Sequence, residues 1–179
     1  MTAPPESVVE RARRVRLLVL DVDGVLTDGR LYFDSQGNEL KAFHTRDGFG
    51  LATLGRCGIE VALITARESA MVTRRAAQLR IRHVYQGRED KLSAYLELLE
   101  ETGFTDGDAC YAGDDWVDLP ILQRVGLAVS VPGADPAVLE RVHWVTGCGG
   151  GNGAVRDICR LILEAQGHAG RVLQEYLQP

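Results

Sequence analysis

The feature that most restricts the fold of this chain is an aliphatic run, residues 17–20, that ends in two aspartates. Asp21 and Asp23 follow the run directly, and Gly24 comes next. A short apolar run bounded by glycine is typical of a strand buried on both faces of a parallel sheet. Carboxylates at the carboxyl end of such a strand lie where open α/β sheets bind their ligands. Because burying a carboxylate is costly unless a cation or a proton compensates it, this strand end is a candidate reaction site.

Apolar runs and helical patterns alternate along the rest of the chain. This order predicts an α/β fold, a Rossmann-like doubly wound parallel sheet with helices on both faces. The tail over 153–177 is helical by pattern, with an interruption around 167–170. The expected strands are 17–20, 60–64, 81–85, 109–112, 127–131 and 143–145, and the expected helices between them are 49–57, 68–79, 91–102, 117–125 and 136–140.

One insertion, over about residues 30–43, breaks this alternation directly after the first strand. Residues 31–34 and 39–43 are expected to pair as a β-hairpin around a polar turn, and the hairpin should project over the acidic site. Its strands carry apolar residues on both faces, which an isolated hairpin could not expose and remain soluble. The hairpin is therefore expected either to pack on its own domain or to pair with other subunits.

Bulk composition restricts the class of protein. A length of 179 residues suits one domain over 1–179. The net charge of −5 and scattered arginines argue against nucleic acid, and no apolar run reaches the ~20 residues of a membrane helix. Residues 1–16 are arginine-rich without an apolar core, so a frayed start is expected rather than a signal peptide. Zinc is not expected, because no CxxC or CxxH spacing joins Cys57, Cys110, Cys148 and Cys159. Cys110 lies in an apolar strand, which suits a buried thiol and a cytoplasmic protein.

Residues able to do chemistry follow three further strands. Thr65 follows the second strand, and Lys91 opens the helix after the third. Asp114 and Asp115 follow the fourth, with Asp118 one helical turn later. The carboxyl ends of parallel strands meet at one edge, so these groups should gather there with the first two aspartates. Clustered carboxylates recruit a hard cation such as Mg²⁺, and an ammonium and a hydroxyl beside them suit phosphoryl transfer.

The two leading aspartates would take unequal roles in such a reaction. Asp21 would attack phosphorus and become an aspartyl phosphate. Asp23 would protonate the leaving alkoxide, then take a proton from the water that releases phosphate. The alternative is structural: the first pair could be strand-end caps, and Asp114 and Asp115 could be helix N-caps. For the second pair both roles can hold at once, with Asp115 or Asp118 capping or bracing the turn and Asp114 binding metal.

The motif order also resembles a known superfamily. DVDGVLTDG at 21–29, then Thr65, Lys91 and GDDWVDLP at 113–120, resembles the aspartate-nucleophile phosphatases of the haloacid dehalogenase superfamily. The segments FHTRDGFG (43–50), ITAR (64–67), HVYQG (83–87) and GGGNGAVRD (149–157) resemble the 3-deoxy-D-manno-octulosonate 8-phosphate phosphatase family, from about residue 15 to the C-terminus. The resemblance implies a Mg²⁺-dependent phosphatase acting on a small sugar-acid phosphate in lipopolysaccharide biosynthesis.

The resemblance also implies site residues. Asp21, the main-chain carbonyl of Asp23, and Asp114 would hold Mg²⁺. The catalytic residues would be Asp21, Asp23, Thr65 and Lys91, with Asp115 and Asp118 in support. The substrate would contact Asp23, His44, Thr45, Arg46, Asp47, Gly48, Thr65, Arg67, Arg75 and Lys91.

Several of these residues could instead have a structural role without contacting the substrate. Arg46 and Asp47 could form a helix-start ion pair, Arg67, Arg74 and Arg75 could form a solvated face, and His44 could be structural. Ala66 stands where the family usually has glycine. Arg67 favours an octulosonate, because its guanidinium fits a carboxylate, whereas relatives acting on nine-carbon 9-phosphates tend to carry glutamate there.

Neither gap between the motifs can hold a cap domain. Asp23 and Thr65 are separated by the hairpin and one helix, and Lys91 and Asp114 by a single helix. The resemblance implies a homotetramer in which neighbouring subunits cover the site through the hairpin and the glycine-rich segment and tail, about 147–179. The alternatives are a nine-carbon sialic-acid-type 9-phosphate phosphatase and a non-catalytic oligomerisation domain beside a nucleotidyltransferase. A receiver domain is disfavoured, because the third strand runs into Tyr85-Gln86-Gly87 rather than an aspartate.

Overall fold

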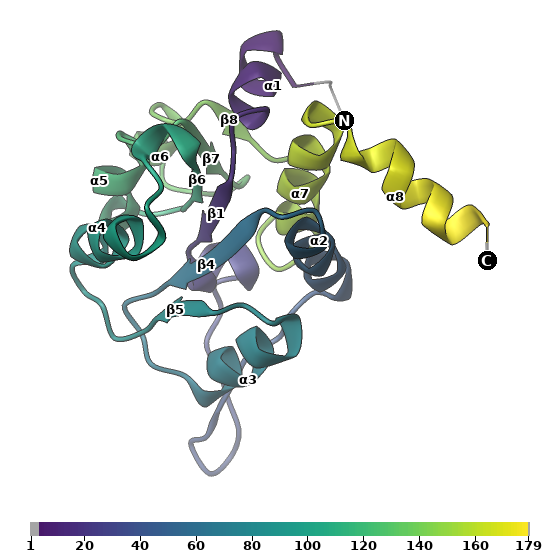
Figure 1. Ribbon diagram of the computed structural model, residues 1–179. Helices are drawn as coiled ribbons and strands as arrows, with labels where there is room; N and C mark the ends of the chain where they lie inside the picture. Colours follow the sequence, from purple (N-terminus) through teal and green to yellow (C-terminus); the bar gives the residue numbers. More distant parts are fainter. Residues whose placement is uncertain (1–3, 179) are drawn as a thin grey trace.

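The computed structural model describes residues 4–178 and is built on a six-stranded sheet in the order β5-β4-β1-β6-β7-β8 (Figure 1). Every neighbouring pair of strands in this sheet is parallel, which confirms the predicted fold. β5 and β8 begin later than the apolar runs that predicted them. The strands are β1 (Leu17–Leu20), β4 (Glu60–Ile64), β5 (His83–Tyr85), β6 (Ala109–Ala112), β7 (Leu127–Ser130) and β8 (Trp144–Val145).

The central strand β1 explains why its sequence is uniformly apolar. All four of its residues are buried, and they pair in register with β4 on one side and β6 on the other. A strand in this position has helices over both faces, so no residue of it meets water. The same register brings the carboxyl ends of β1, β4 and β6 to one edge of the sheet.

Helices cover both faces of the sheet. On one face α2 and α7 pack against each other, with α3 beside α2, and on the other face α4 packs against α5 (Figure 1). The predicted helix over 117–125 is a 3₁₀ turn, η3 (Trp116–Asp118), followed by the short α5. The helices are α2 (Thr45–Arg56), α3 (Ala70–Leu79), α4 (Lys91–Thr102), α5 (Leu119–Leu122), α6 (Pro136–Leu139), α7 (Ala154–Ala165) and α8 (His168–Leu177).

The C-terminal tail contains the interruption that its sequence predicts. Gly167 takes a left-handed conformation, φ 73°, between α7 and α8, and α8 then extends away from the body (Figure 1). Leu173, Tyr176 and Leu177 on α8 are exposed. Within residues 4–178, no helix combines the length and the apolarity that crossing a membrane requires.

The expected frayed start is wrong. Residues Glu6–Ala12 form a helix, α1, that packs on α7. Val8 and Ala12 lie one turn apart on its buried side, and Arg11 donates a hydrogen bond to the carbonyl of Gly126 at 2.7 Å. Two buried apolar residues in a seven-residue helix give too weak a periodic pattern to predict a helix from the sequence.

The predicted hairpin is present but short. β2 (Tyr32–Phe33) and β3 (Glu39–Leu40) pair antiparallel in a sheet of their own, and the hairpin projects from the body at the lower edge of Figure 1. Asp34 organises its turn by accepting hydrogen bonds from the backbone of Gln36 and Asn38 at 2.8 and 2.9 Å. Its apolar side chains, Leu31, Tyr32, Phe33 and Leu40, are 39–59% exposed, so its own chain leaves them uncovered.

Candidate active site

Asp21 is the first residue after β1 and is almost fully buried. Its N–H donates to the carbonyl of Ala112 at 2.9 Å, which ties it to the end of β6. The chain then turns through η1 (Val22–Leu26), where Gly24 has φ 105°. A Cβ on Gly24 would lie 2.1 Å from Oδ2 of Asp114. Glycine at this position therefore lets the carboxylate of Asp114 approach the loop that carries Asp21 and Asp23.

Lys91 lies between two buried carboxylates. Its ammonium donates to Oδ1 of Asp21 at 2.6 Å and to Oδ1 of Asp118 at 2.7 Å, and its side chain is 3% exposed. The lysine is the first residue of α4, whose start is capped by the side chain of Asp90. The structure thus brings together the nucleophile candidate, the ammonium and the acid of η3, from three separate strand ends.

Asp118 acts as a brace for this cluster, which means that its carboxylate holds the neighbouring side chains and backbone in place. Besides Lys91, its carboxylate accepts hydrogen bonds from the Tyr111 hydroxyl at 2.7 Å and from the N–H groups of Asp114 and Asp115 at 2.9 and 3.2 Å. Asp115 is exposed, and its side chain caps η3 by accepting from Trp116 N–H. Tyr111 is fully buried in β6, and the sequence gives no sign of its role, because it reads as one more apolar strand residue.

Three carboxylates could hold a metal at this edge. Oxygens of Asp21, Asp114 and Asp118 lie within 4.8 Å of one another. Four hydrogen bonds, one of them the ion pair with Lys91, use the acceptor capacity of Asp118, so Asp21 and Asp114 have the oxygens left for a cation. An all-oxygen set with few carboxylates is the donor chemistry that Mg²⁺ takes in phosphate-binding sites. The residues present therefore fit Mg²⁺.

The electrostatics of the cluster favour added positive charge. Burial, and then repulsion from Asp118, raises the pKa of Asp21 to about 8, although Lys91 acts in the opposite direction. Burial and Asp118 also raise the pKa of Asp114 to about 6. Burial opposes the charged form of Lys91, but its attraction to Asp21 and Asp118 outweighs burial and raises the pKa of Lys91. The carboxylates thus carry protons more readily than usual until a cation joins them.

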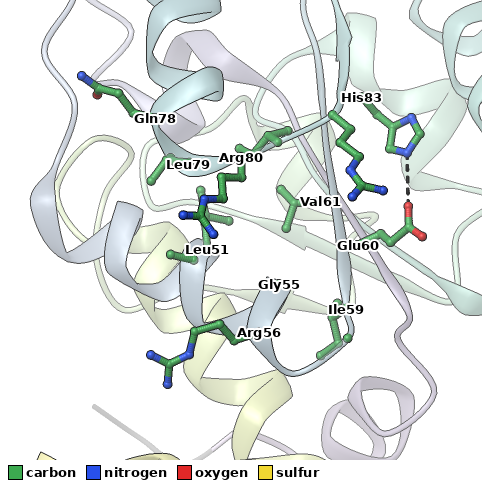
Figure 2. A pocket seen from close by; sticks show the side chains of 14 residues that line it. Leu51, Gly55, Arg56, Ile59, Glu60, Val61, Gln78, Leu79, Arg80 and His83 are labelled. Carbon is green, nitrogen blue, oxygen red and sulfur yellow. Dashed lines mark hydrogen bonds and ion pairs between the residues drawn. The ribbon is translucent and has the colours of Figure 1, made fainter.

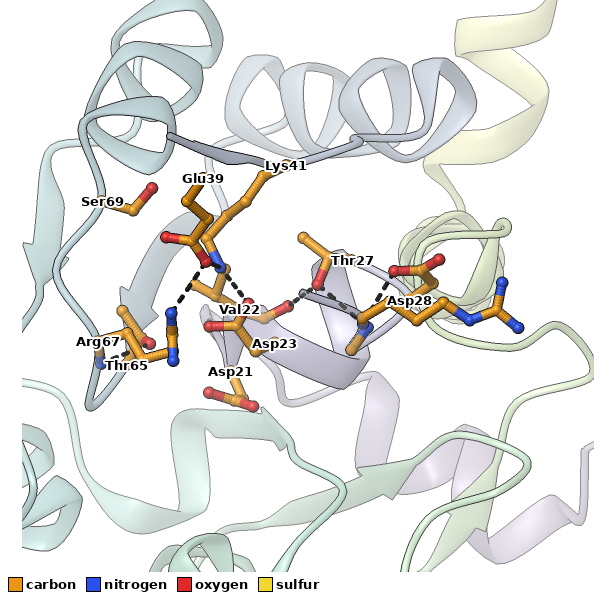
Figure 3. Close-up of polar contacts among 12 residues, drawn as sticks. Asp21, Val22, Asp23, Thr27, Asp28, Glu39, Lys41, Thr65, Arg67 and Ser69 are labelled. Carbon is orange, nitrogen blue, oxygen red and sulfur yellow. Dashed lines mark hydrogen bonds and ion pairs between the residues drawn. The ribbon is translucent and has the colours of Figure 1, made fainter. Parts of the chain in front are cut away.

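Asp23 lies under the base of the hairpin (Figure 3). Its Oδ1 accepts from the ammonium of Lys41, while its Oδ2 is buried without a hydrogen-bond partner among the described residues. Glu39 contacts both cations of this region, Lys41 at 3.5 Å and Arg67 at 3.0 Å. Sequence reasoning missed Lys41 and Glu39, since both lie in a hairpin predicted from turn residues and apolar positions alone.

Thr65 follows β4, as predicted, and is buried at the same edge of the sheet as Asp21, which follows the paired strand β1. Its N–H donates to the carbonyl of Tyr85, and its hydroxyl oxygen accepts from the N–H of Arg67 at 3.2 Å. Its backbone is thereby fixed to the neighbouring strand β5. The hydroxyl hydrogen is free to donate to another acceptor.

Several predicted substrate contacts lie at the start of α2. His44 is the N-cap residue, and its Nδ1 is buried without a partner in the described structure. Asp47 is fully buried, and its Oδ1 accepts from the N–H of Arg156 at 2.8 Å in the first turn of α7. Burial raises the pKa of Asp47. Asp47 therefore caps α7, and no ion pair joins it to the exposed Arg46 within residues 4–178.

A cavity of about 320 Å³ opens beside Lys41, between the hairpin base and α3. The guanidinium of Arg75 lies 5.9 Å from the ring centre of Phe43. Gly48 makes room for it, because a Cβ there would lie 2.2 Å from a terminal nitrogen of Arg75. The cavity thus unites Thr45 and Arg75 of the predicted contacts with Arg74, and its full lining is Lys41, Phe43, Thr45, Met71, Arg74, Arg75 and Gln78.

A second cavity, of about 500 Å³, lies at the opposite end of the sheet (Figure 2). It includes Glu60 and His83, which begin β4 and β5 and lie 3.1 Å apart through Oε2 and Nε2. The aspartates follow the carboxyl ends of the strands, so this cavity is not part of the acidic cluster.

The glycine-rich segment packs on the loop that follows β1. Gly151 N–H donates to the carbonyl of Val25 at 3.1 Å, and a Cβ on Gly150 would lie 1.7 Å from the carbonyl oxygen of Gly24. Only glycine allows this approach. Gly153 then precedes α7, which confirms that the tail is helical from about residue 153, and the glycine-rich segment packs against its own subunit.

Comparisons with known proteins agree with this architecture. A family model described as haloacid dehalogenase-like hydrolase matches residues 75–157. The chain is 47% identical over 160 residues, 89% of this chain and 85% of the relative, to a 3-deoxy-D-manno-octulosonate 8-phosphate phosphatase of Escherichia coli (strain K12).

Solved structures give the same result. A 3-deoxy-D-manno-octulosonate 8-phosphate phosphatase from Moraxella catarrhalis, in complex with magnesium, phosphate and a KDO molecule, superposes with a TM-score of 0.92 at 40% identity, covering 94% of this chain and 97% of that one. A cobalt-bound deoxy-D-mannose-octulosonate 8-phosphate phosphatase from Haemophilus influenzae superposes with a TM-score of 0.89 at 36% identity, covering 94% of this chain and 99% of that one. By sequence and by structure, the chain belongs to the 3-deoxy-D-manno-octulosonate 8-phosphate phosphatase family of haloacid dehalogenase-like hydrolases.

Proposed function

We propose that this protein is a Mg²⁺-dependent phosphatase that hydrolyses 3-deoxy-D-manno-octulosonate 8-phosphate to the free sugar acid and phosphate. The observation that carries the proposal is the buried cluster in which Lys91 bridges Asp21 and Asp118 while Asp114 lies beside them. Relatives of that name share 47% of its residues across most of the chain. This complete cluster argues against a non-catalytic oligomerisation domain, which has no need of buried, costly carboxylates.

The first half-reaction transfers the phosphoryl group to the protein. An oxygen of Asp21 attacks phosphorus, and the bond from phosphorus to the sugar C8 oxygen breaks. The free Oδ2 of Asp23 is the oxygen available to give its proton to the departing alkoxide. Lys91 holds Asp21 in one orientation for this attack.

The second half-reaction releases phosphate. A water attacks the phosphorus of the aspartyl phosphate, Asp23 takes the proton from that water, and the bond to Asp21 breaks. The hydroxyl of Thr65 donates to a phosphate oxygen in both halves. Asp21, Asp114 and the main-chain carbonyl of Asp23 would hold Mg²⁺, which supplies positive charge against the phosphate oxygens when bound.

We assign the sugar acid to the cavity beside Lys41. Its cations Arg74 and Arg75 are the charge that a carboxylate requires. Arg67, on the loop after β4, pairs with Glu39 at the hairpin base, two residues before Lys41 of the cavity lining. A nine-carbon acid 9-phosphate carries the same carboxylate, but its chain between the carboxylate and the phosphate is longer by one carbon. The eight-carbon acid is favoured by Arg67 and by the relatives.

We extend the proposal to assembly and location. The exposed apolar residues of the hairpin and of α8 are the surfaces through which subunits of a homotetramer would cover one another's sites. The four cysteines, all within the described residues, are unpaired, which suits a reducing cytoplasm. The product would supply the eight-carbon acid of lipopolysaccharide.

A phosphate-release assay over sugar-acid phosphates tests the proposal. We expect rapid release from 3-deoxy-D-manno-octulosonate 8-phosphate with Mg²⁺, little release after chelation, and a lower kcat/KM for a nine-carbon 9-phosphate. A preference for the nine-carbon compound would replace the substrate, and no release from either would refute the phosphatase. Sedimentation of the active protein as a monomer would refute the tetramer.

A further inference from the structure

Lysine occurs at just two positions in this chain, Lys41 and Lys91, and the other basic residues among its 20 Lys and Arg are arginines. Both lysine side chains are buried, at 2% and 3% exposure, and each contacts one of the two leading aspartates. Lys91 contacts Asp21, and Lys41 contacts Asp23. An ammonium is a compact point charge that a planar guanidinium cannot replace in a small buried space. The pattern gives Lys41 a place beside Asp23 that parallels the place of Lys91 beside Asp21.

We propose that Lys41 is a positioning residue for Asp23, holding its carboxylate with one oxygen fixed and the other directed to the reaction. The proposal rests on the phosphatase function above. Oδ1 of Asp23 is taken by Lys41, and Oδ2 is buried without a partner among the described residues. Because only one of its two oxygens is hydrogen-bonded, the Asp23 carboxylate is held in a single orientation. The group that must meet first the leaving oxygen and then the water is therefore held in place before substrate arrives.

The position of Glu39 shows why a positive charge is required at Lys41. The Glu39 carboxylate lies 3.5 Å from the Lys41 ammonium, so the lysine stands between two acids (Figure 3). Without its charge, Asp23 and Glu39 would repel each other across the same small space. Glu39 also pairs with the exposed Arg67 at 3.0 Å. The hairpin base thereby links the acid–base residue to the loop after β4.

The test replaces Lys41 by methionine, which keeps the length of the side chain and removes the charge. We expect kcat for the sugar-acid phosphate to fall about 10- to 100-fold, because general acid–base catalysis contributes about that much or more and depends on placement. We expect KM to change less than about threefold. Arg160→Met, which removes one positive charge from an exposed position on α7, is the matched control and should leave both constants unchanged.

A substrate with a good leaving group separates positioning from general damage. para-Nitrophenyl phosphate needs no proton on its leaving group, so Lys41→Met should form the aspartyl phosphate readily and hydrolyse it slowly. Mass spectrometry of acid-quenched protein should then detect phosphate on Asp21. The phosphorylated fraction should be smaller than in Asp23→Asn, which loses the acid–base group entirely. Adding Glu39→Gln to Lys41→Met removes the repulsion and should recover part of kcat.

Three results would overturn the proposal. They are a kcat within twofold of wild type, a raised KM with unchanged kcat, which would make Lys41 a substrate contact, and a lowered kcat without trapped phosphoenzyme. If Lys41→Met does not fold, Lys41→Gln, which also removes the charge beside Asp23, gives the same readouts. A wild type that cleaves para-nitrophenyl phosphate but no sugar-acid phosphate would refute the substrate alone, since the trapped phosphoenzyme still reports on Lys41.

Discussion

The two lysine–aspartate pairs sit in different kinds of structure. Lys91 and Asp21 lie at the carboxyl edge of the central sheet, and Asp118 beside them is fully buried. Lys41 comes from the hairpin, an element of two short strands whose other side chains are largely exposed, and its partner Asp23 is 20% exposed. Asp21, the proposed nucleophile, is thus fixed by the core of the fold, and Asp23, the proposed acid–base residue, by a surface element. The position of Asp21 therefore depends on the central sheet, whereas the position of Asp23 also depends on the hairpin, a peripheral element.

The largest effect should come from the core pair. Asp21→Asn removes the attacking oxygen, and we expect kcat to fall about 10⁴-fold or more. The fold should remain, since the change also removes a buried charge from a crowded acidic cluster. Phosphate release and circular dichroism measure the two effects. Glu140→Gln, at a side chain 73% exposed, is the control, and a variant of Asp21 that retains turnover would exclude the covalent route.

Removing the brace should affect both stability and metal affinity. Asp118→Asn places an amide N–H₂ or a weaker acceptor before Lys91 and Tyr111, so we expect a loss of about 3 kcal/mol in the free energy of unfolding. Mg²⁺ affinity should fall about 10- to 100-fold as Asp114 loses its fixed position. Urea unfolding and calorimetric Mg²⁺ titration measure these changes.

A matched control for the brace lies elsewhere in the chain. Asp106 accepts from the Tyr95 hydroxyl at 3.0 Å and pairs with Arg124 at 3.0 Å, a similar set of contacts outside the site. Asp106→Asn should cost some stability and leave Mg²⁺ affinity unchanged. Equal loss of affinity in both variants would show that Asp118 acts on the metal only through general stability.

The same contrast explains what the sequence could predict. Leu17–Leu20 had to be a buried parallel strand, and the strand ends then had to gather Asp21, Thr65, Lys91 and Asp114 at one edge. Topology alone does this, without knowledge of any side-chain contact. The predicted helix bounds are wrong where short turns replace a helix, as at η3 and α5, because local capping by Asp115 and Asp118 decides them.

Contacts made by side chains from distant elements could not be predicted. Lys41 reaches Asp23 over 18 residues, and Tyr111 reaches Asp118 from inside a strand. Neither residue belongs to a periodic pattern that distinguishes it. Asp47 shows the same limit: its sequence neighbours suggest an ion pair with Arg46, whereas the fold brings it to the start of α7, 109 residues away. The scarcity of lysine was the one available signal for Lys41.

Metal binding should depend on pH in the direction set by the core cluster. Asp21 has its pKa raised to about 8 and Asp114 to about 6, so the metal-free fold binds protons that the unfolded chain releases near its ordinary carboxyl pKa. These groups therefore stabilise the metal-free fold at low pH, and their contribution is lost as pH rises through these values. Mg²⁺ must displace the protons, so its affinity should rise up to about tenfold per pH unit between pH 6 and 8.

Calorimetry in buffers of different ionisation enthalpy measures the protons released as Mg²⁺ binds. We expect release to diminish above pH 8. Affinity that does not vary with pH would mean that Asp21 and Asp114 are already ionised in the metal-free protein. Asp23→Asn leaves the carboxylates of Asp21 and Asp114 in place, so this variant should preserve the pH dependence.

The smallest effect on the chain itself should come from the tip of the hairpin. Phe33 is 59% exposed, so Phe33→Ser should change the free energy of unfolding of the subunit by less than about 0.5 kcal/mol. If the tip joins subunits, the same change removes an aromatic anchor and should shift sedimentation toward smaller species. Lys41→Met at the base should do the reverse, lowering kcat and leaving assembly intact. Activity and assembly that fall together in both variants would mean that the hairpin positions Asp23 only when it is held by a neighbouring subunit.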